Sequence, residues 1–203
     1  MSHKCNDYII KDNEFVRDFE KMYKKIKDPW NQESAEHNHI ERLASLTSSI
    51  TEKPGKILDV GCATGYFSKI VQKVFTKCEY IGTDISPTAI MKASKNFSAK
   101  FIVDDIKQNN LQFCKKFDIV FCSKTIYYLA PEIDVVLNNI ISYLKNGGVF
   151  SCLYNYSKDS FSSKWLNPNL LARKLEELNM KEIKFIKEES ENDDNYYLIY
   201  KKK

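Results

Sequence analysis

The feature that most restricts the fold of this chain is the regular alternation of short apolar runs and amphipathic segments after residue 55. Residues 56–60 (KILDV) form a short apolar run with an acid near its end, and residues 117–122 (FDIVFC) are apolar almost throughout, as expected of a central strand covered on both faces. Residues 66–75 instead carry apolar side chains at helical spacing. Strands that alternate with helices in this way predict an α/β fold.

The rest of the chain after residue 55 continues this alternation. Further strands are expected at residues 79–83, 100–103, 149–154, 181–187 and 196–200, and further helices at residues 86–96, 131–144 and 169–178. Ser86 caps its helix and Pro87 fits the first helical turn. The sequence Asn146-Gly147-Gly148 is expected to stop the helix at residues 131–144. The polar stretch 188–195 is expected to connect the last two strands as a hairpin.

The first fifty residues have a different pattern, which predicts two helices, at about residues 13–27 and 32–50. The sequence Asp28-Pro29-Trp30 separates them, because the residue before a proline is disfavoured in helical conformation. A length of 203 residues fits one domain with a substantial core.

Charge and composition argue against a nucleic-acid partner. The formal net charge is only +4, and the lysines are spread along the whole sequence, which indicates a solvated surface. A nucleic-acid-binding protein more often has a concentrated basic stripe. We therefore expect neither DNA nor RNA as a partner.

Cysteine spacing and hydropathy suggest a cytoplasmic protein. The six cysteines form no CxxC pair, and no Cys/His cluster has zinc-ligand spacing, so neither a disulfide framework nor a metal site is expected. The N-terminus has no apolar signal-peptide region, and no uncharged apolar run is long enough to span a bilayer. We expect no contact with a membrane.

The strand at residues 56–60 leads directly into a glycine-rich turn. Gly61 and Gly65 bound this turn, and Cys62 and Ala63 lie inside it. Such a turn at the carboxyl end of a strand lets a ligand lie against bare backbone. Asp59 comes just before the turn, where its carboxylate can accept hydrogen bonds from a cationic ligand group.

Acidic residues also end the next two predicted strands. Asp84 follows the strand at residues 79–83, and a carboxylate there can accept from both hydroxyls of a ribose. Asp104, Asp105 and Ile106 follow the strand at residues 100–103, where an acid can accept from an exocyclic amine and an apolar side chain can pack on a base. Together these residues predict an adenosine lying across the carboxyl ends of neighbouring strands.

Other interpretations of these signals have less support. Each glycine turn or strand-end acid alone is also consistent with a tight connection or a helix cap. A dinucleotide site would need the GxGxxG pattern, but Ala63 occupies its second glycine and Tyr66 its third, which disfavours a nicotinamide-dependent oxidoreductase. A P-loop is excluded because no Gly-Lys-Ser/Thr sequence follows the turn.

The motifs ILDVGCATGYFS, IGTDIS, VDDI, FDIVFCSKTIYYL and LKNGGVF resemble, in order, those of class I methyltransferases that use S-adenosylmethionine (SAM). The resemblance covers roughly residues 56–203 and implies a doubly wound, Rossmann-like seven-stranded sheet whose last strand is antiparallel. The family often has GxGxG at the loop, where this chain has Ala63 in the middle position. The implied cofactor-binding residues are Asp59, Gly61, Cys62, Ala63, Gly65, Phe67, Asp84, Ile85, Asp104, Asp105, Ile106, Ser123 and Lys124.

A narrower resemblance points to the nodulation-type N-methyltransferases and their relatives, which modify sugars in bacterial glycan pathways. It is carried by Asp28-Pro29-Trp30 with the following Ser34 and Glu36, and by Tyr127-Tyr128-Leu129. It implies that Trp30 and its neighbours fold over the cofactor. Residues 1–50 are then a helical lid that belongs to the same domain as the SAM-binding residues 51–203.

Methyl transfer needs a base only if the acceptor must lose a proton. His3 lies near the terminus, whereas His37 and His39 lie on the predicted lid helix and are catalytic candidates. Their i, i+2 spacing places them on different helix faces, so at most one is expected to point inward. Tyr127 and Tyr128 are also catalytic candidates, since they follow the fourth strand, where the family's acceptor lies. Solvated or capping histidines and ordinary aromatic packing are the alternatives for these four residues.

Other residues near the expected acceptor have less support. They are Asp134 and Asn155, and the aromatic and basic residues Tyr154, Tyr156, Lys158, Lys164 and Trp165 in or after the fifth strand. These last five suit a sugar or phosphorylated acceptor, or else form a surface loop.

The sequence thus predicts a monomeric or homodimeric SAM-dependent methyltransferase. Its acceptor is expected to be an oxygen or nitrogen of a small polar molecule, such as a sugar or a capsule-type glycan precursor. An RNA or protein methyltransferase is one alternative, although Ser123-Lys124-Thr125-Ile126 stands where amino-methylating nucleic-acid enzymes carry their Pro-Pro signature. A SAM-binding protein without catalysis is another alternative.

Overall fold

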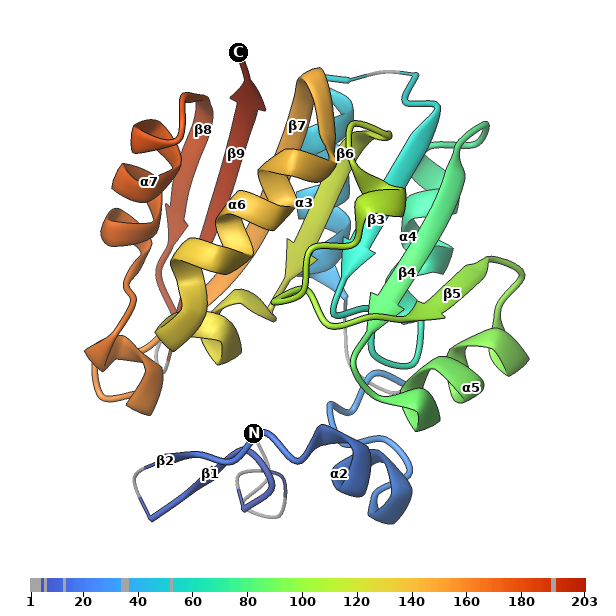
Figure 1. The fold of residues 1–203 in the computed structure, drawn as a ribbon, viewed down its shortest axis with the longest axis vertical. Coiled ribbons are helices and arrows are strands. Elements are labelled where there is room, and N and C mark those ends of the chain that lie inside the picture. Colours follow the sequence, from blue (N-terminus) through green and yellow to red (C-terminus); the bar gives the residue numbers. More distant parts are fainter. Residues whose placement is uncertain (1–4, 6, 13, 34–36, 52, 191–192) are drawn as a thin grey trace.

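The computed structural model describes residues 5, 7–12, 14–33, 37–51, 53–190 and 193–203. A seven-stranded sheet in the order β5-β4-β3-β6-β7-β9-β8 forms its centre (Figure 1). The strands are β3 (Lys56–Val60), β4 (Glu79–Asp84), β5 (Lys100–Val103), β6 (Phe117–Ser123), β7 (Leu144–Tyr156), β8 (Met180–Glu188) and β9 (Asp194–Lys202). β9 is antiparallel to β7 and β8, whereas β5, β4, β3, β6 and β7 pair in parallel. The predicted doubly wound sheet with an antiparallel last strand is therefore confirmed.

Helices cover both faces of the sheet. α3 (Asn38–Ser48) and α4 (Tyr66–Val74) lie on one face, and α6 (Ile133–Tyr143) and α7 (Pro168–Glu177) lie on the other (Figure 1). Successive strand residues point to opposite faces, so Ile57 of β3 enters the hydrophobic cluster with α3 and α4, and Leu58 enters the cluster with α6 and α7. The apolar composition of the central strands follows from this double coverage.

The remaining helix after residue 55 is α5 (Pro87–Asn96), which packs near β4 and β5. Ser86 caps it by accepting a hydrogen bond from the Ala89 amide, as predicted. Short 3-10 helices η1 (Leu111–Phe113), η2 (Ile126–Glu132) and η3 (Phe161–Lys164) complete the connections.

The prediction for residues 13–27 is wrong at its start. β1 (Ile10–Lys11) and β2 (Glu14–Phe15) pair as a hairpin, and only α2 (Phe19–Lys25) is helical, with Asp18 as its cap. Arg17 has a positive φ of 54°, which interrupts a helix before residue 18. Asn13, the predicted start, lies outside the described residues. This segment lies at the carboxyl ends of the parallel strands (Figure 1).

The second predicted helix is shorter than residues 32–50, because α3 begins at Asn38. The carboxylate of Asp28 accepts hydrogen bonds from the amides of Gln32 and Glu33, which holds these two residues in a turn. Ser34 and Glu36, which carried part of the narrower resemblance, lie outside the described residues.

The expected helix stop at residues 146–148 is also wrong. α6 ends at Tyr143, and β7 begins directly at Leu144, so these residues lie inside a long strand. Gly147 has φ +75°, and the pairing of β7 with β6 shifts register between Phe117 and Ile119. The glycines thus accommodate an irregularity in the strand instead of ending a helix. Within the described residues, no helix has the length and apolar composition needed to cross a membrane.

Candidate active site

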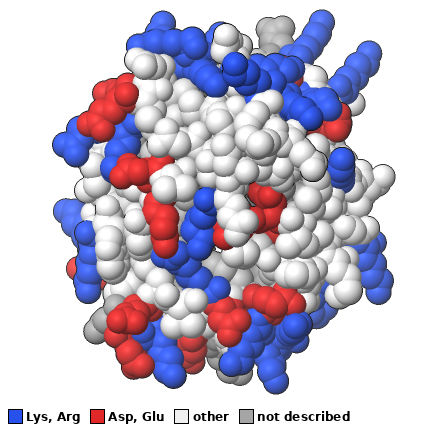
Figure 2. All heavy atoms as spheres, in the orientation of Figure 1, with Lys and Arg blue, Asp and Glu red and all other residues white. Residues whose placement is uncertain are grey.

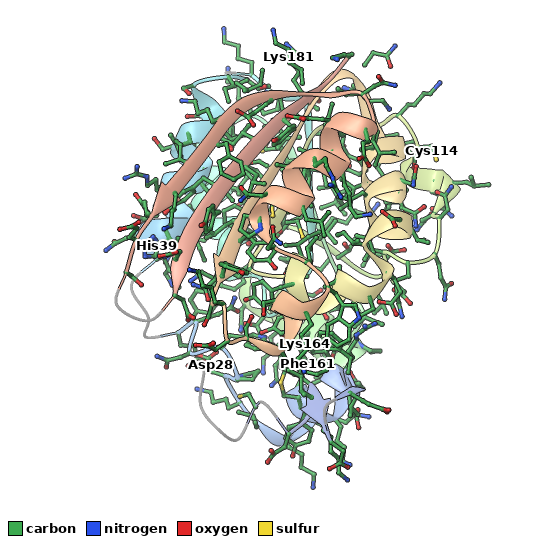
Figure 3. The ribbon with its side chains drawn as sticks, turned by 90° about the vertical axis from the view of Figure 1, so that its left-hand side faces the viewer. Asp28, His39, Cys114, Phe161, Lys164 and Lys181 are labelled. Atoms are coloured by element: carbon green, nitrogen blue, oxygen red, sulfur yellow. The ribbon has the colours of Figure 1, made fainter. Side chains whose placement is uncertain are left out.

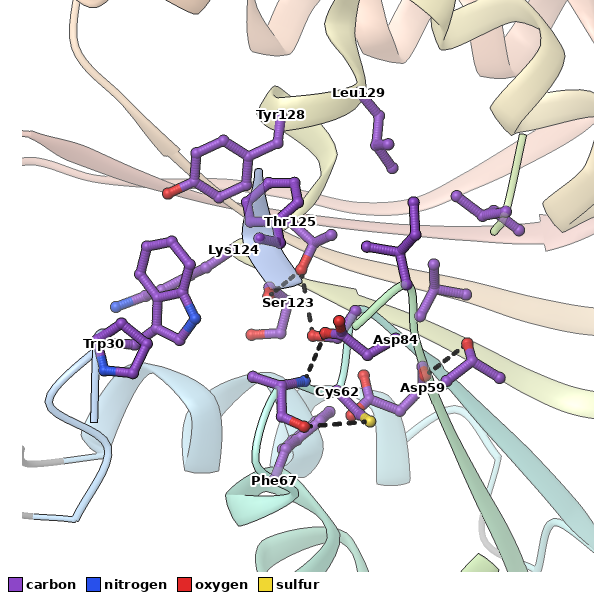
Figure 4. A pocket seen from close by; sticks show the side chains of 18 of the residues that line it. Trp30, Asp59, Cys62, Phe67, Asp84, Ser123, Lys124, Thr125, Tyr128 and Leu129 are labelled. Carbon is purple, nitrogen blue, oxygen red and sulfur yellow. Dashed lines mark hydrogen bonds between the residues drawn. The ribbon is translucent and has the colours of Figure 1, made fainter. Parts of the chain in front are cut away.

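A cavity of about 920 Å³ lies between the carboxyl ends of the parallel strands and the N-terminal segment (Figure 4). Every predicted cofactor-binding residue except Gly65 lines this cavity, and so do Trp30 and the predicted catalytic residues His37, His39, Tyr127 and Tyr128. The tertiary structure therefore brings together residues from both halves of the chain. No group of three His, Cys, Asp or Glu side chains suited to a metal ion occurs in the described part of the chain.

The glycine turn after β3 lies against the loop that follows β6. Gly61 has φ +75°, and a Cβ atom there would lie 2.4 Å from Cγ2 of Thr125. The amides of Gly61 and Cys62 both donate to the carbonyl of Thr83 at 2.8 Å, which ties the turn to β4. Only a glycine allows this close approach, so the first glycine of the motif has a local steric cause.

Asp84 connects the end of β4 to the glycine turn. Its Oδ2 accepts from the Ala63 amide at 3.0 Å, and its Oδ1 accepts from the Ser86 amide at 2.9 Å. Ala63 has φ +51°, a conformation uncommon for a residue with a Cβ. Burial raises the pKa of Asp84 to about 6. A carboxylate has about four acceptor positions, so Asp84 retains capacity to accept from a ligand.

Asp59 is a second buried acid in the cavity wall. Its Oδ2 accepts a hydrogen bond of 2.6 Å from the hydroxyl of Tyr80, and only 2% of the residue is exposed. Burial raises the pKa of Asp59 to about 7, and the nearby charge of Asp84 also raises it. Tyr80 was not predicted from the sequence as a partner of Asp59. The two residues lie close together because β3 pairs with β4.

The structure distinguishes the two acids after β5. The Asp104 carboxylate accepts from the side-chain amide of Asn110 at 2.9 Å, and burial raises its pKa. Asp105 accepts from the backbone amide of Lys107 at 3.1 Å. Next to them, Ile106 is buried, whereas Ile85 is 45% exposed although it is apolar. Acidic and apolar groups thus share this end of the cavity.

Trp30 closes the cavity from the N-terminal side. Its indole nitrogen donates to the hydroxyl of Tyr23 at 2.5 Å, and its ring lies 5.7 Å from that of Tyr128. Nearby, Thr64 of the glycine turn donates to the side chain of Gln32 at 2.9 Å. The Thr64–Gln32 bond joins the N-terminal segment to the turn after β3, and the packing of Trp30 near Tyr128 joins it to η2 (Figure 4).

Two side chains join α2 to α5: Glu20 of α2 contacts the start of α5, and Lys92 of α5 contacts α2. Glu20 accepts from the hydroxyl of Ser86 at 2.6 Å and from the amide and hydroxyl of Thr88 at 3.0 and 2.8 Å. Burial alone raises the pKa of Glu20, but the hydrogen bonds outweigh this effect and lower the pKa to about 2. Lys92 donates to the carbonyl of Tyr23 at 2.8 Å. Glu20 thereby accepts from donor groups at the start of α5, and Lys92 donates to a carbonyl near the end of α2. Such groups at helix ends lack partners within their own helix.

The predicted catalytic tyrosines have different surroundings. Tyr128 is 8% exposed and packs between Phe19 and Trp30. The ring of Tyr127 contacts those of Tyr128 and Tyr154 at 4.5 and 5.7 Å. Burial raises the pKa of both Tyr127 and Tyr128, so both hydroxyls stay protonated at neutral pH.

Both histidines line the cavity, contrary to the expectation for two residues on one helix. His37 is the N-cap of α3 and lies outside the regular helix, so the i, i+2 rule does not apply to it. Its ring packs 5.8 Å from that of Tyr66, while His39 contacts Tyr197 of β9.

The polar residues after β6 lie at the other end of the cavity. Ser123 has a buried hydroxyl oxygen without a hydrogen-bond partner among the described residues. Lys124 adopts a positive φ of 54°, and desolvation lowers the pKa of its ammonium group. Asn155 of β7 also lines this region. An unsatisfied hydroxyl and a lysine in the cavity wall are groups that a polar ligand can engage.

Several residues suggested for the acceptor region do not line the cavity. They are Asp134, Tyr154, Tyr156, Lys158, Lys164 and Trp165. Asp134 pairs with Lys174 on the surface. Tyr154 is fully buried and donates to the carbonyl of Leu166, and Trp165 packs on Phe161. The cavity-lining residues that the sequence analysis missed include Phe15, Arg17, Phe19, Tyr23, Gln32 and Thr125. Most come from the N-terminal segment, where no motif indicates contact with the sheet.

The chain matches a family model described as a methyltransferase domain over residues 51–202. Malonyl-[acyl-carrier protein] O-methyltransferase 1 of Ilyobacter polytropus is 31% identical over 102 residues, which cover 48% of this chain and 37% of that protein. The corresponding protein of Halalkalibacterium halodurans is 24% identical over 150 residues, which cover 71% of this chain and 55% of that protein. The chain therefore spans about half or less of the length of these relatives.

Solved structures share the same fold. N-methyltransferase NodS from Bradyrhizobium japonicum, in complex with S-adenosyl-L-homocysteine, superposes with a TM-score of 0.73 at 20% identity. The match covers 90% of this chain and 97% of the NodS chain. A TehB-like SAM-dependent methyltransferase from Corynebacterium glutamicum has a TM-score of 0.70 at 18% identity, with coverages of 91% and 98%. At these identities the similarity shows a common fold.

Proposed function

We propose that this chain, which belongs to the methyltransferase domain family, is a SAM-dependent enzyme that methylates an oxygen or nitrogen of a small polar acceptor, such as a saccharide or glycan precursor. The single observation that carries this proposal is the composition of the cavity. One end has carboxylates and apolar side chains suited to an adenosyl group, and the other end has the polar and aromatic residues His39, Lys124, Tyr127 and Asn155.

The adenosyl end fits SAM on structural grounds. Gly61 leaves no room for a Cβ and presents bare backbone, while Asp84 retains acceptor capacity for ribose hydroxyls. Asp105 and the apolar Ile85 and Ile106 suit an exocyclic amine and the flat face of adenine. We assign the cofactor contacts to these residues on that basis.

Bound SAM supplies an activated methyl group on a sulfonium, so the protein mainly has to align the acceptor and exclude water. The N-terminal segment suits the second task, because Arg17 bonds to Glu132 of η2 at 2.9 Å and Trp30 packs on Tyr128. We propose that residues 1–50 act as the lid of the single domain. The acceptor then enters on the side of Lys124 and Asn155.

A small acceptor is more consistent with the surface than a nucleic acid. On the face shown in Figure 2, many basic side chains gather along the upper edge, at the opposite end of the molecule from the N-terminal segment. Acidic and basic side chains are mixed around the lower end. A bound polyanion would require an excess of positive charge near the cavity.

A carboxylate acceptor is the second candidate, and Lys124 is the observation that favours it. Among the cavity-lining cations of the described residues, Arg17 pairs with Glu132 and Lys107 lies 3.8 Å from Asp105, whereas Lys124 forms no ion pair with a described carboxylate and feels the charge of Asp193 only at longer range. The relative from Ilyobacter polytropus is named for methylating malonyl-[acyl-carrier protein]. A malonyl group carries a carboxylate.

An acceptor panel with methyl-labelled SAM distinguishes these candidates. The panel contains amino sugars, neutral saccharides, sugar nucleotides and a malonyl thioester, and mass spectrometry detects methylated products. We expect turnover with a saccharide-type acceptor. Turnover with the malonyl thioester alone would favour the second candidate. SAM binding without any methylated product would instead indicate a non-catalytic binding protein.

A further inference from the structure

A polar cluster borders the acceptor end of the cavity and connects α3 with the last two strands. His39 lies in the first turn of α3, Glu188 ends β8, and Asn195 and Tyr197 belong to β9. His39 lies beside the ends of these strands in Figure 3. It also lines the cavity, whereas Glu188, Asn195 and Tyr197 do not. The cluster therefore links a cavity residue to groups behind the cavity wall.

The contacts of Tyr197 determine where the proton of its hydroxyl goes. Its oxygen lies 2.6 Å from Oε2 of Glu188, to which it donates, and 2.8 Å from Nδ1 of His39. Burial raises the pKa of Tyr197, as does the hydrogen bond to Glu188, so the hydroxyl stays protonated. Because a phenol has one proton, the oxygen that donates to Glu188 accepts from Nδ1–H of His39.

The other edge of the imidazole points to the same tautomer. The side-chain amide nitrogen of Asn155 donates to Oδ1 of Asn195 at 3.3 Å, which orients the Asn195 amide with its nitrogen toward His39. That nitrogen lies 3.5 Å from Nε2 of His39. Nε2 is thus an acceptor, and its present hydrogen bond is at the weak limit of such distances. A hydroxyl or amine of a bound acceptor can replace it.

Two charged side chains belong to the cluster around the imidazole. Glu188 also lies 3.3 Å from Nδ1 of His39, and Arg42 of α3 pairs with Oε1 of the same carboxylate. Arg42 therefore fixes the position of Glu188 without occupying the oxygen that faces Tyr197 and His39. Among the described residues, the groups in contact with the His39 ring are thus Glu188 on β8 and Asn195 and Tyr197 on β9, and Arg42 acts through Glu188.

We propose that His39 accepts the proton of the methyl acceptor at Nε2, and that Tyr197 and Glu188 are positioning residues that hold this tautomer. This inference rests on the proposed function, for an acceptor with an O–H or N–H group. The acceptor atom forms a bond to the methyl carbon, the carbon–sulfur bond breaks with its electron pair going to sulfur, and the acceptor proton passes to Nε2. The resulting imidazolium is stabilised by Glu188 and returns its proton to solvent.

The tautomer can be measured without any acceptor. Long-range ¹H–¹⁵N spectra of ¹⁵N-labelled full-length protein at pH 8 distinguish protonation at Nδ1 from protonation at Nε2, and a His39→Gln variant assigns the signals. We expect His39 to carry its proton on Nδ1. Tyr197→Phe should shift the population toward protonation at Nε2, whereas Tyr196→Phe, at the neighbouring position on β9, should leave it unchanged. A proton on Nε2 in the unmodified protein would overturn the proposal.

Kinetics and calorimetry separate this proposal from the assignment of the cofactor. With the acceptor found in the panel and saturating SAM, His39→Gln should lower kcat by about 100- to 10,000-fold and leave the Kd of SAM unchanged. Tyr197→Phe should cause a smaller loss and change the pH profile of kcat. Unchanged kcat in His39→Gln would refute the role of His39 alone. If the unmodified protein does not bind SAM in calorimetry, the proposed function itself is refuted.

Discussion

At the scale of single residues, Asp84 holds the glycine turn and the start of α5 with its two carboxylate oxygens. Replacing it with alanine leaves two amides without that acceptor and removes the proposed partner of the ribose hydroxyls. We expect the affinity for SAM, measured by calorimetry, to fall at least about tenfold. Asp134→Ala is the matched control, because Asp134 lies on the surface and pairs with Lys174. Equal affinities in both variants would contradict the ribose assignment.

Gly61 tests the steric argument for the turn, and Gly147 provides a control with the same backbone angle. Both have φ +75°, but a Cβ on Gly61 would lie 2.4 Å from Thr125, whereas one on Gly147 would have its nearest neighbour, Lys201, at 3.7 Å. Gly147→Ala should therefore cost only about 1–2 kcal/mol of backbone strain. Gly61→Ala should cost more in urea denaturation and should also weaken SAM binding. Equal losses of stability would mean that close approach does not explain Gly61.

At the scale of secondary-structure elements, the proposed lid is held by a small apolar cluster of its own, in which Met22 and Tyr23 pack with Ala89 and Tyr128, and by polar contacts. Glu20 of α2 accepts a hydrogen bond from Ser86 at the start of α5, Lys92 of α5 donates one to the carbonyl of Tyr23 in α2, and Trp30 packs on Tyr128 of η2. Because this cluster is separate from the two clusters that contain the sheet residues, the segment can open locally without unfolding the sheet. We therefore expect changes in this segment to affect ligand retention more than global stability.

Trp30→Ala tests this expectation for the lid. Loss of the indole removes its packing on Tyr128 and its hydrogen bond to Tyr23, so SAM should dissociate faster, as measured by stopped-flow competition. Trp165→Ala removes the other tryptophan of the chain, which is 40% exposed and does not line the cavity, and should leave the dissociation rate unchanged. If Trp30→Ala changes only the thermal stability, the residue belongs to the core and the lid proposal fails.

At the scale of the whole molecule, the raised pKa values of two buried acids predict that SAM binding depends on pH. Burial raises the pKa of Asp59 to about 7 and that of Asp84 to about 6 in the protein without ligand. A cationic cofactor and ribose hydroxyls favour the ionised forms, so affinity for SAM should be constant above pH 8. It should fall by about tenfold per pH unit below pH 6 for each group that must lose a proton to bind.

The stability of the ligand-free protein should change in the opposite direction. Because both acids have a higher pKa in the folded than in the unfolded state, they weaken folding progressively as the pH rises from about 4 to 7. Asp84→Asn should lower the affinity for SAM and flatten its pH dependence. Calorimetry and urea denaturation between pH 5 and 8 measure both effects. An unchanged pH profile in Asp84→Asn would show that Asp84 does not titrate on binding.

The sequence predicted the elements whose pattern repeats locally. β3 and β5 have the predicted bounds, because a short apolar run between polar turns leaves little freedom in where a strand begins or ends. The N-terminal segment was predicted less well. A helix was predicted from about residue 13, but β1 and β2 form a hairpin and Arg17 has a positive φ, so the helix begins only at Phe19.

By itself, the sequence determined the α/β alternation, the glycine turn and the acids at the strand ends, because each depends on residues close together in the chain. Only the tertiary structure decided that Trp30 meets Tyr128, that Tyr80 donates to Asp59, and that His39 meets Tyr197. Those contacts depend on strand order and on how α2 and α3 pack, which long-range burial of apolar surface fixes. A local pattern of residues carries no record of which distant partner that burial selects.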